Sequence, residues 1–484
     1  MLAMGLAAMD GTIVATAIPS IVHDLGGFSL FPWVFSVYLL VQAALIPIYG
    51  KLADVYGRKP MLMIGSIIFL LGSMLSGLSW NMVALIVFRG VQGIGAAAII
   101  PIATTVVGDL FSLQERAKMQ GYLSSVWGVS AVVGPAIGGF LVQYASWHWV
   151  FYINVPIGIA ALLVIGYLFH EKVTPRRHVI DYWGSILLMT SMGALILGLL
   201  EGGVDWAWAS WQSAATLGGG ILLVLILILV ESRAKEPIVP LWVFGRRVLA
   251  IANVSSLIVG ILSMGLSSFL PTYVQGVLRQ SPLIAGFSLA TMSIGWPVAS
   301  AFSGKLYLRI GFRNTGLIGA VLVALAGWGF SLLGMHSSVI VVAILSLVMG
   351  AGLGLLSTSM VVAIQSIVGW NRRGVVTGSN MFSRMLGSTL GVAVFGSLVN
   401  ATLVGWFKKT PSAIRALLPK GITASSIVSG SPTSRIPARA MHYVEHGLYL
   451  GIHRIFLGLL IAGLLVTVVG LFFPAKPETL EDLA

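Results

Sequence analysis

A few charged and amide side chains stand inside long apolar stretches of this sequence. Asp10 is the one acid that lies well inside any of the first six apolar runs. A carboxylate at such a depth is costly, so intramembrane acids usually face a cavity and mark an ion or substrate path. A desolvated carboxyl group favours its neutral form, which makes Asp10 a candidate proton carrier. It could equally attract a cationic substrate, or be a polar helix-packing residue near the membrane surface.

Arg89 and Gln92 are the next candidates. At 1.5 Å per residue, Arg89 lies roughly 10 Å and Asp10 roughly 18 Å below the same membrane face. A direct ion pair then requires the long arginine side chain to span about 8 Å, which the sequence leaves open. Gln92 follows Arg89 by three residues and shares its helix face. The pair could take part in coupling or could brace neighbouring helices.

The turn from Gly50 to Pro60 (GKLADVYGRKP) concentrates charge in a chain with only 9% charged residues. Asp54 is expected near the start of the helix that follows Arg373, where the helix dipole stabilises an acid by about 0.3–1 kcal/mol. We expect Arg58 to pair with Asp54 across one helical turn. Such a latch would hold one side of the protein shut; the alternative is a topology signal only. The candidate gate residues are Gly50, Asp54, Gly57, Arg58 and Lys59.

The elements that must position these residues are membrane-spanning helices. The 484 residues are 57% apolar, with a mean hydropathy of +0.97. Apolar runs of about 20 residues can each cross a hydrocarbon core of about 30 Å, and there only helices satisfy their own backbone polar groups. We predict an all-α polytopic protein with fourteen spans. The predicted spans end near Ile21 (the first, starting at Met1) and then cover residues 32–50, 61–79, 82–107, 118–142, 149–169, 183–200, 213–230, 248–273, 283–303, 314–334, 338–367, 375–403 and 448–473.

The basic residues give the expected orientation. The net charge of +13 resides mostly in short loops that fall on one side, so the positive-inside rule explains it and nucleic acid is not a predicted partner. Both termini are then cytoplasmic, and the first run is a span rather than a signal peptide. The long outer loop 404–447 is basic and departs from the rule. There is no cysteine, and the histidines lack ligand spacing, so we predict no metal site and no cofactor.

The chain contains an internal repeat. Gly50-Lys51-Leu52 recurs as Gly304-Lys305-Leu306, and the loop ending at Gly121 recurs as the loop ending at Gly378, with offsets 304 − 50 = 254 and 378 − 121 = 257. Leu308 stands where Asp54 would fall, so the latch should be one-sided. The predicted units are an N-terminal six-helix bundle (1–169), a linker with two inserted helices (170–247), a C-terminal six-helix bundle (248–473) and a tail (474–484). Repeats of this kind are used by alternating-access carriers.

Several stretches resemble the major facilitator superfamily and, within it, the fourteen-span drug:proton antiporters of the EmrB/QacA type. Residues 9–19 (MDGTIVATAIP), 50–60, 89–97 (RGVQGIGAA), 149–158 and 270–275 are similar to motifs of this group. The antiporter motif of that group is matched by Gly128, Gly134, Pro135, Gly138 and Gly139. The resemblance implies the major-facilitator fold and a role for Arg89 in proton transfer. Physically, Gly134 and Gly138 would allow close helix approach and Pro135 would bend the helix; generic packing is the alternative.

We therefore predict proton-coupled efflux of lipophilic, including cationic, drugs by a monomer in the cell membrane, driven by the proton gradient. Export of a specific metabolite (a peptide, sugar or amino acid) is the main alternative, and a channel is the weaker one. No Walker loop is present for an ATP-driven pump, and the buried acids are too few for a membrane enzyme. Asn380 and Arg384 are candidate cavity residues that could repel cations, hold an anion or brace the helices.

Overall fold

The computed structural model describes residues 1–25, 31–169, 171, 182–202, 206–234, 241–280, 282–415, 417 and 437–475. Helices make up nearly all of this part, with one isolated bridge between Gly202 and Trp206. The first helices are α1 (Leu2–Leu25), α2 (Phe31–Tyr56), α3 (Arg58–Gly77), α4 (Met82–Leu110), α5 (Leu113–Tyr144), α6 (Trp149–Tyr152) and α7 (Asn154–Leu168). Next come α8 (Tyr182–Glu201), α9 (Trp211–Ser213), η2 (Ala214–Gly218), α10 (Gly219–Glu231) and α11 (Trp242–Gly245). The last are α12 (Arg247–Gly276), α13 (Pro282–Ser331), α14 (Val339–Ser366), η3 (Trp370–Arg372), α15 (Arg373–Lys408), α16 (Ser412–Arg415) and α18 (Ala438–Leu471).

Ten helices in the described part of the chain are long and apolar enough to cross a membrane. The longest of them, α13, is interrupted at Gly311, where the backbone leaves the helical region. The protein is therefore a multi-pass membrane protein. These ten helices do not decide the total number of spans, so the predicted count of fourteen stays a prediction.

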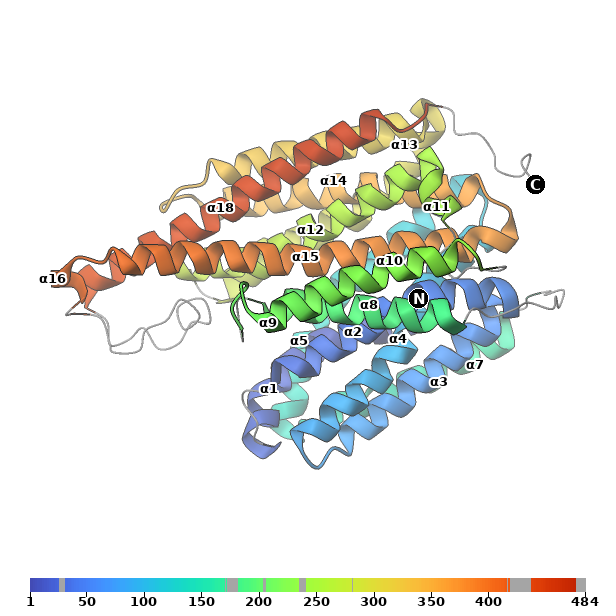
Figure 1. The fold of residues 1–484 in the computed structure, drawn as a ribbon, viewed down its shortest axis with the longest axis horizontal. Coiled ribbons are helices and arrows are strands. Elements are labelled where there is room, and N and C mark those ends of the chain that lie inside the picture. The colour runs from blue at the N-terminus through green and yellow to red at the C-terminus, as the bar shows by residue number, and fades with distance from the viewer. Residues whose placement is uncertain are drawn as a thin grey trace.

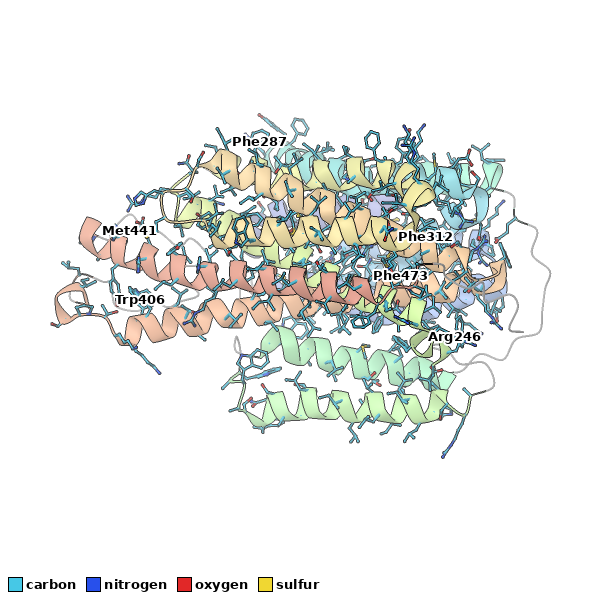
Figure 2. The ribbon with its side chains drawn as sticks, turned by 90° about the horizontal axis from the view of Figure 1, so that it is seen from above. Arg246, Phe287, Phe312, Trp406, Met441 and Phe473 are labelled. Atoms are coloured by element: carbon cyan, nitrogen blue, oxygen red, sulfur yellow. The ribbon has the colours of Figure 1, made fainter. Side chains whose placement is uncertain are left out.

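The helices form two groups with a pair beside them. Figure 1 shows α1 to α7 on one side of the molecule and α12 to α18 on the other. In Figure 2, α8 and α10 form a separate layer along the side of these groups. One apolar cluster runs through α12 to α18, and two clusters lie mainly within α1 to α7. A small cluster joins Leu188 and Met192 of α8 to Ala44 of α2, with Phe382 of α15 packed against it.

The repeat is visible in the backbone. Gly57 (φ 97°) ends the turn between α2 and α3, and Gly311 (φ 82°) breaks α13 at the equivalent place, 311 − 57 = 254 residues later. Side chains strongly disfavour this φ range, whereas glycine adopts it freely. Each half thus makes the same sharp turn between two long helices. We call the end of the molecule that holds these two turns the gate end.

The opposite end differs from the prediction. The predicted loop 404–447 is helical at both margins, because α15 continues to Lys408 and α18 already begins at Ala438. The Trp406 ring stacks on Tyr443 at 4.8 Å, and each residue donates a side-chain hydrogen bond of 3.1 Å to the other's carbonyl oxygen. These contacts extend the helix pair past the point where hydropathy falls (Figure 2). The basic linker residues Lys172, Arg176 and Arg177, most of the loop, and the tail after residue 475 lie outside the described residues.

Candidate functional site

The structure brings Asp10, Arg89 and Gln92 together in a closed triangle, and all three are fully buried. Arg89 Nη1 lies 2.5 Å from Asp10 Oδ2 and donates to Gln92 Oε1 at 2.7 Å. Gln92 Nε2 donates to Asp10 Oδ1 at 2.8 Å. The 8 Å gap expected between Asp10 and Arg89 does not separate them, because residue counts from helix ends ignore helix tilt. The open question of a direct ion pair is answered: the pair forms.

Two further residues complete this cluster, and the sequence analysis did not single them out. Asn154, at the start of α7, donates to Asp10 Oδ1 at 3.3 Å and to Ser73 Oγ at 3.0 Å. The guanidinium carbon of Arg89 lies 4.2 Å from the centre of the Tyr38 ring. Asn154 falls within the 149–158 motif, and an amide in that apolar run was a usable signal. Among the described residues, Arg89 Nη2 and the Tyr38 hydroxyl have no hydrogen-bond partner.

The arrangement surrounds one carboxylate with hydrogen-bond donors. In the geometry seen here, Asp10 accepts hydrogen bonds from three side chains, one of them the cationic guanidinium of Arg89. A proton on Asp10 would remove the ion pair and leave the guanidinium of Arg89, already short of one partner, to find another acceptor. The cluster is therefore an element whose hydrogen bonds depend on a single proton.

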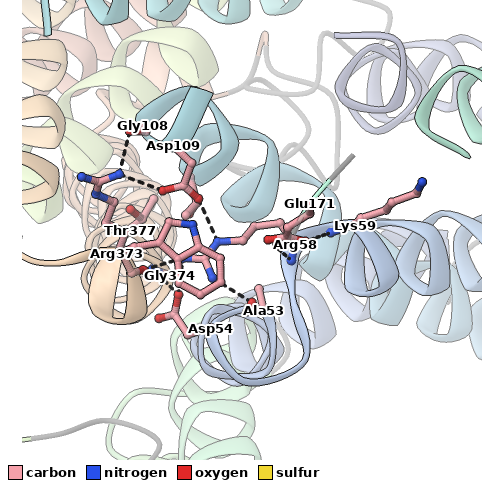
Figure 3. A network of polar contacts seen from close by, with 12 residues as sticks. Ala53, Asp54, Arg58, Lys59, Gly108, Asp109, Glu171, Arg373, Gly374 and Thr377 are labelled. Carbon is pink, nitrogen blue, oxygen red and sulfur yellow. Dashed lines mark hydrogen bonds and ion pairs between the residues drawn. The ribbon is translucent and has the colours of Figure 1, made fainter. Parts of the chain in front are cut away.

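A second polar cluster lies at the gate end and joins the two helix groups (Figure 3). The Asp54 carboxylate accepts hydrogen bonds from the backbone N–H groups of Gly374 (2.9 Å) and Val375 (2.8 Å) in the first turn of α15. Its ion pair with Arg58 is 2.6 Å long. The pairing was predicted, but across one helical turn; in the structure Gly57 breaks the helix between the two residues, so the pair spans a turn of the chain.

Arg58 is the centre of this gate cluster and is fully buried. Its Nε lies 2.9 Å from Asp109 Oδ2, its Nη2 donates to the Trp370 carbonyl at 2.7 Å, and its guanidinium carbon lies 3.9 Å above the Trp370 ring. Asp109 in turn pairs with Arg373 at 3.0 Å. Asp109 and Trp370 were missed by the sequence analysis. Asp109 ends α4 next to a charged loop, where an acid is commonplace and gave no distinct signal.

The other predicted gate residues divide into two kinds. A Cβ on Gly50 would lie 2.7 Å from the carbonyl oxygen of Gly374, so α2 and α15 are in backbone contact there and only glycine fits. Lys59 does not reach across: its Nζ donates to the carbonyl of Gly166 at 2.7 Å and its N–H donates to Glu171 at 2.9 Å. These contacts stay within the first group of helices.

The second copy of the turn also contacts the opposite group. Tyr307 lies on α13, and its hydroxyl donates to the Leu113 carbonyl of α5 at 2.5 Å. Leu308 carries no carboxylate and is exposed. The prediction of a one-sided latch is therefore wrong for the contact and holds only for the charge: both copies bridge the groups, one by ion pairs and one by a neutral hydrogen bond.

The predicted antiporter motif lies on α5, which packs between α1 and α13. A Cβ on Gly128 would lie 2.8 Å from the Ser293 carbonyl oxygen of α13, so the two groups touch closely at this glycine. Gly134 and Gly138 are buried, whereas Gly139 is exposed and a Cβ there would meet nothing within 4 Å. Pro135 lies within α5, nearer its C-terminal end.

Comparison with known proteins decides the family. The profile of the Major Facilitator Superfamily matches residues 1–184 and 171–392. The chain belongs to the Major Facilitator Superfamily. Multidrug transporter protein MdtP of Bacillus subtilis is 36% identical over 402 residues, covering 83% of this chain and 74% of that protein. Multidrug resistance protein 3 of Bacillus subtilis is 34% identical over 484 residues, covering 99% and 94%. Efflux pump FUS6 of Gibberella moniliformis is 33% identical over 461 residues, covering 92% and 81%.

Solved structures agree on the fold. The proton:xylose symporter XylE of the same superfamily superposes with a TM-score of 0.63 at 14% identity, covering 100% of this chain and 96% of that one. By the family match, the relatives named as transporters and the apolar helices, this major facilitator superfamily member is a multi-pass membrane transporter rather than an enzyme, as predicted.

Asn380 and Arg384 lie one turn apart on α15 and differ in burial and in hydrogen-bond partners. Asn380 is buried; its Oδ1 accepts from Ser256 at 2.8 Å and its Nδ2 donates to the Ala252 carbonyl at 3.1 Å. Of the two roles left open for Asn380, these contacts favour bracing, because its amide joins α15 to α12. Arg384 is only partly buried, and its Nη2 contacts Met381 Sδ at 2.9 Å.

Proposed function

We propose that this transporter exports lipophilic drugs in exchange for protons by alternating access. The observation that carries the proposal is the buried Asp10–Arg89–Gln92 cluster, a titratable ion pair inside a membrane transporter. Intramembrane acids of this kind belong to ion paths in transporters. The relatives named as multidrug transporters and efflux pumps support drug export.

In this mechanism the proton and the gate act on different clusters. Protonation of Asp10 removes its ion pair with Arg89 and loosens the contacts among α1, α4 and α7. The gate cluster holds α2 and α4 against η3 and α15 until the two helix groups rock. The tight approach of α5 to α13 at Gly128 gives the groups a surface about which to move.

We further propose that the transporter has fourteen spans, as in the EmrB/QacA type, and acts as a monomer in the cell membrane. Two six-helix bundles (1–169 and 248–473) would flank the inserted pair (170–247). Both termini and the gate end would then be cytoplasmic, in line with the basic loops. The conformation described here would be closed on the cytoplasmic side.

The proposal is tested in proteoliposomes with an imposed pH gradient and a panel of lipophilic cations, lipophilic anions and neutral drugs. In proteoliposomes that contain the wild type, we expect the pH gradient to drive drug transport in the direction opposite to proton flow. Asp10→Asn should abolish this coupling. Asp24→Asn is the matched control, because Asp24 lies on the same helix, where it accepts from the Trp147 indole outside the cluster. Gradient-driven transport by Asp10→Asn at the wild-type rate would overturn the proposal. So would a wild type that no gradient can drive.

A further inference from the structure

Three arginines inside or between the helix groups, Arg58, Arg89 and Arg373, each pair with a carboxylate. Asp10 is neutralised by Arg89. At the gate, Asp54 and Asp109 are matched by Arg58 and Arg373. Arg384, which is partly buried, differs from them: among the described residues no carboxylate pairs with it, and the one hydrogen bond of its side chain goes to the thioether of Met381.

Arg384 lies where the two helix groups meet. It follows Arg373, the first residue of α15, by eleven positions, which at 1.5 Å per residue is about 16 Å along the helix. That distance is close to the middle of a hydrocarbon core about 30 Å thick. Its neighbour Met381 belongs to the apolar cluster of the first helix group, together with Met4 and Tyr38. Through its contact with Met381, the Arg384 guanidinium lies beside this apolar cluster of the first helix group.

A purely structural role fits this arginine poorly. Arg58 and Arg89, which brace helices, each bind a carboxylate and at least one backbone carbonyl. Arg384 binds only a thioether sulfur, a weak acceptor. An arginine held near the middle of a membrane without a counter-ion marks a substrate or ion path. Its guanidinium offers paired N–H donors that match the two oxygens of a carboxylate or sulfonate.

We propose that Arg384 binds the anionic group of the transported compound, so that lipophilic organic anions are preferred substrates. This inference rests on the proposed efflux function and names its substrate class. Met381, which contacts Arg384 and belongs to an apolar cluster, provides an apolar neighbour for the hydrophobic body of such a compound. It replaces the expectation of cationic drugs, because Asp10, the acid that could attract them, is already paired with Arg89.

The membrane potential agrees with this assignment. If one proton enters for each monovalent anion that leaves, the exchange moves two elementary charges in the direction that an inside-negative potential favours. A monovalent cation leaving for one entering proton would gain nothing from the potential. The positive charge of Arg384 thus selects anions, the class of substrate whose export is driven by both the pH gradient and the membrane potential.

The test uses three probes that share one ring system: 1-pyrenebutyrate, its neutral amide, and 1-pyrenebutylamine. Transport is followed by pyrene fluorescence in proteoliposomes with a pH gradient and an inside-negative potential. We expect the wild type to prefer the anion, and Arg384→Gln to lower its apparent affinity for the anion by roughly ten- to hundredfold, the effect of losing a charge-assisted hydrogen bond. The amide should be little affected, and Arg384→Lys should keep part of the preference. Arg454→Gln is the control, since Arg454 lies on α18 and donates to Thr402, away from the place where the two helix groups meet.

Binding to the purified protein, measured by energy transfer from tryptophan to pyrene, separates the two proposals. Pyrenebutyrate binding that Arg384→Gln abolishes supports the anion site even if the pH gradient drives no transport, a result that would overturn only the efflux proposal. An Arg384→Gln variant that binds all three probes as the wild type does would overturn the anion site. Equal loss of all three would do the same, since it indicates a structural role.

Discussion

Asp54→Asn tests whether the gate cluster sets the balance between the two conformations. The substitution keeps the size of the side chain but removes the charge that faces the first turn of α15 and pairs with Arg58. Arg58 retains Asp109, so the arginine is not left unpaired. The state with the gate closed, as seen here, should therefore lose stability relative to the state with the gate open.

The size of the effect follows from the contacts. A partly buried charge at a helix N-terminus contributes up to about 2 kcal/mol, and a hydrogen bond to a charged group about 1.5–3 kcal/mol net. Because one side chain makes both contributions, we expect a loss of about 3 kcal/mol rather than their sum. At 1.4 kcal/mol per factor of ten, the ratio of closed to open molecules falls about a hundredfold.

The chain has no cysteine, so spin labels attach only to cysteines that are introduced at chosen positions. Tyr56→Cys and Ile310→Cys place labels on exposed positions at the gate end of the two helix groups. Pulsed electron–electron double resonance should show a short distance between the two spin labels in the otherwise native protein and a longer one in Asp54→Asn. Leu308→Asn, at the repeat-equivalent and exposed position, is the matched control. An unchanged distance distribution in Asp54→Asn, or an equal shift in Leu308→Asn, would refute the reasoning.

Two further predictions concern glycines. Gly57→Ala and Gly311→Ala should each destabilise the protein by about 1–3 kcal/mol, because both positions have φ and ψ values open only to glycine; thermal unfolding in detergent measures this, and equal stability to wild type would contradict it. Gly128→Val should abolish transport because a Cβ there already falls 2.8 Å from a carbonyl oxygen of α13, whereas Gly139→Val should be tolerated, since no atom lies within 4 Å; drug transport by correctly inserted protein checks both, and a transporting Gly128→Val would count against close contact at α5.

The sequence could reveal the buried charges but not their partners. Asp10 and Arg89 stand out because charged residues are rare in apolar runs, and Asp54 because its turn is repeated without the acid. Their pairing depends on how helices tilt, which residue counts do not contain. Asp109 escaped notice because acids are common at helix ends, although it holds both Arg58 and Arg373. The superfamily was predictable because its motifs cover most of the chain, and the profile match confirms it.

Helix ends were predictable only where hydropathy decides them. Beyond Val404, α15 continues because Trp406 and Tyr443 lock two helices together, a contact between residues 37 positions apart. The sequence left the role of Asn380 open between a cavity and bracing for a related reason. An amide in an apolar helix can satisfy its hydrogen bonds with a neighbouring helix as well as with a ligand, and only the position of Ser256 on α12 decides between them.

The two copies of the turn show how a duplicated element can take unequal roles without losing either contact. Gly57 and Gly311 preserve the backbone, and both turns connect the helix groups. The first copy uses charges, which bind more strongly and orient a helix N-terminus. The second copy uses the neutral hydroxyl of Tyr307, whose ring stacks on Phe312, the counterpart of Arg58 at the offset of 254. A neutral bond breaks at lower cost, so opening should begin at the Tyr307 contact and be limited by the Asp54 cluster. Rocking between the halves would then be controlled from one side of the gate, the side on which α2 meets α15.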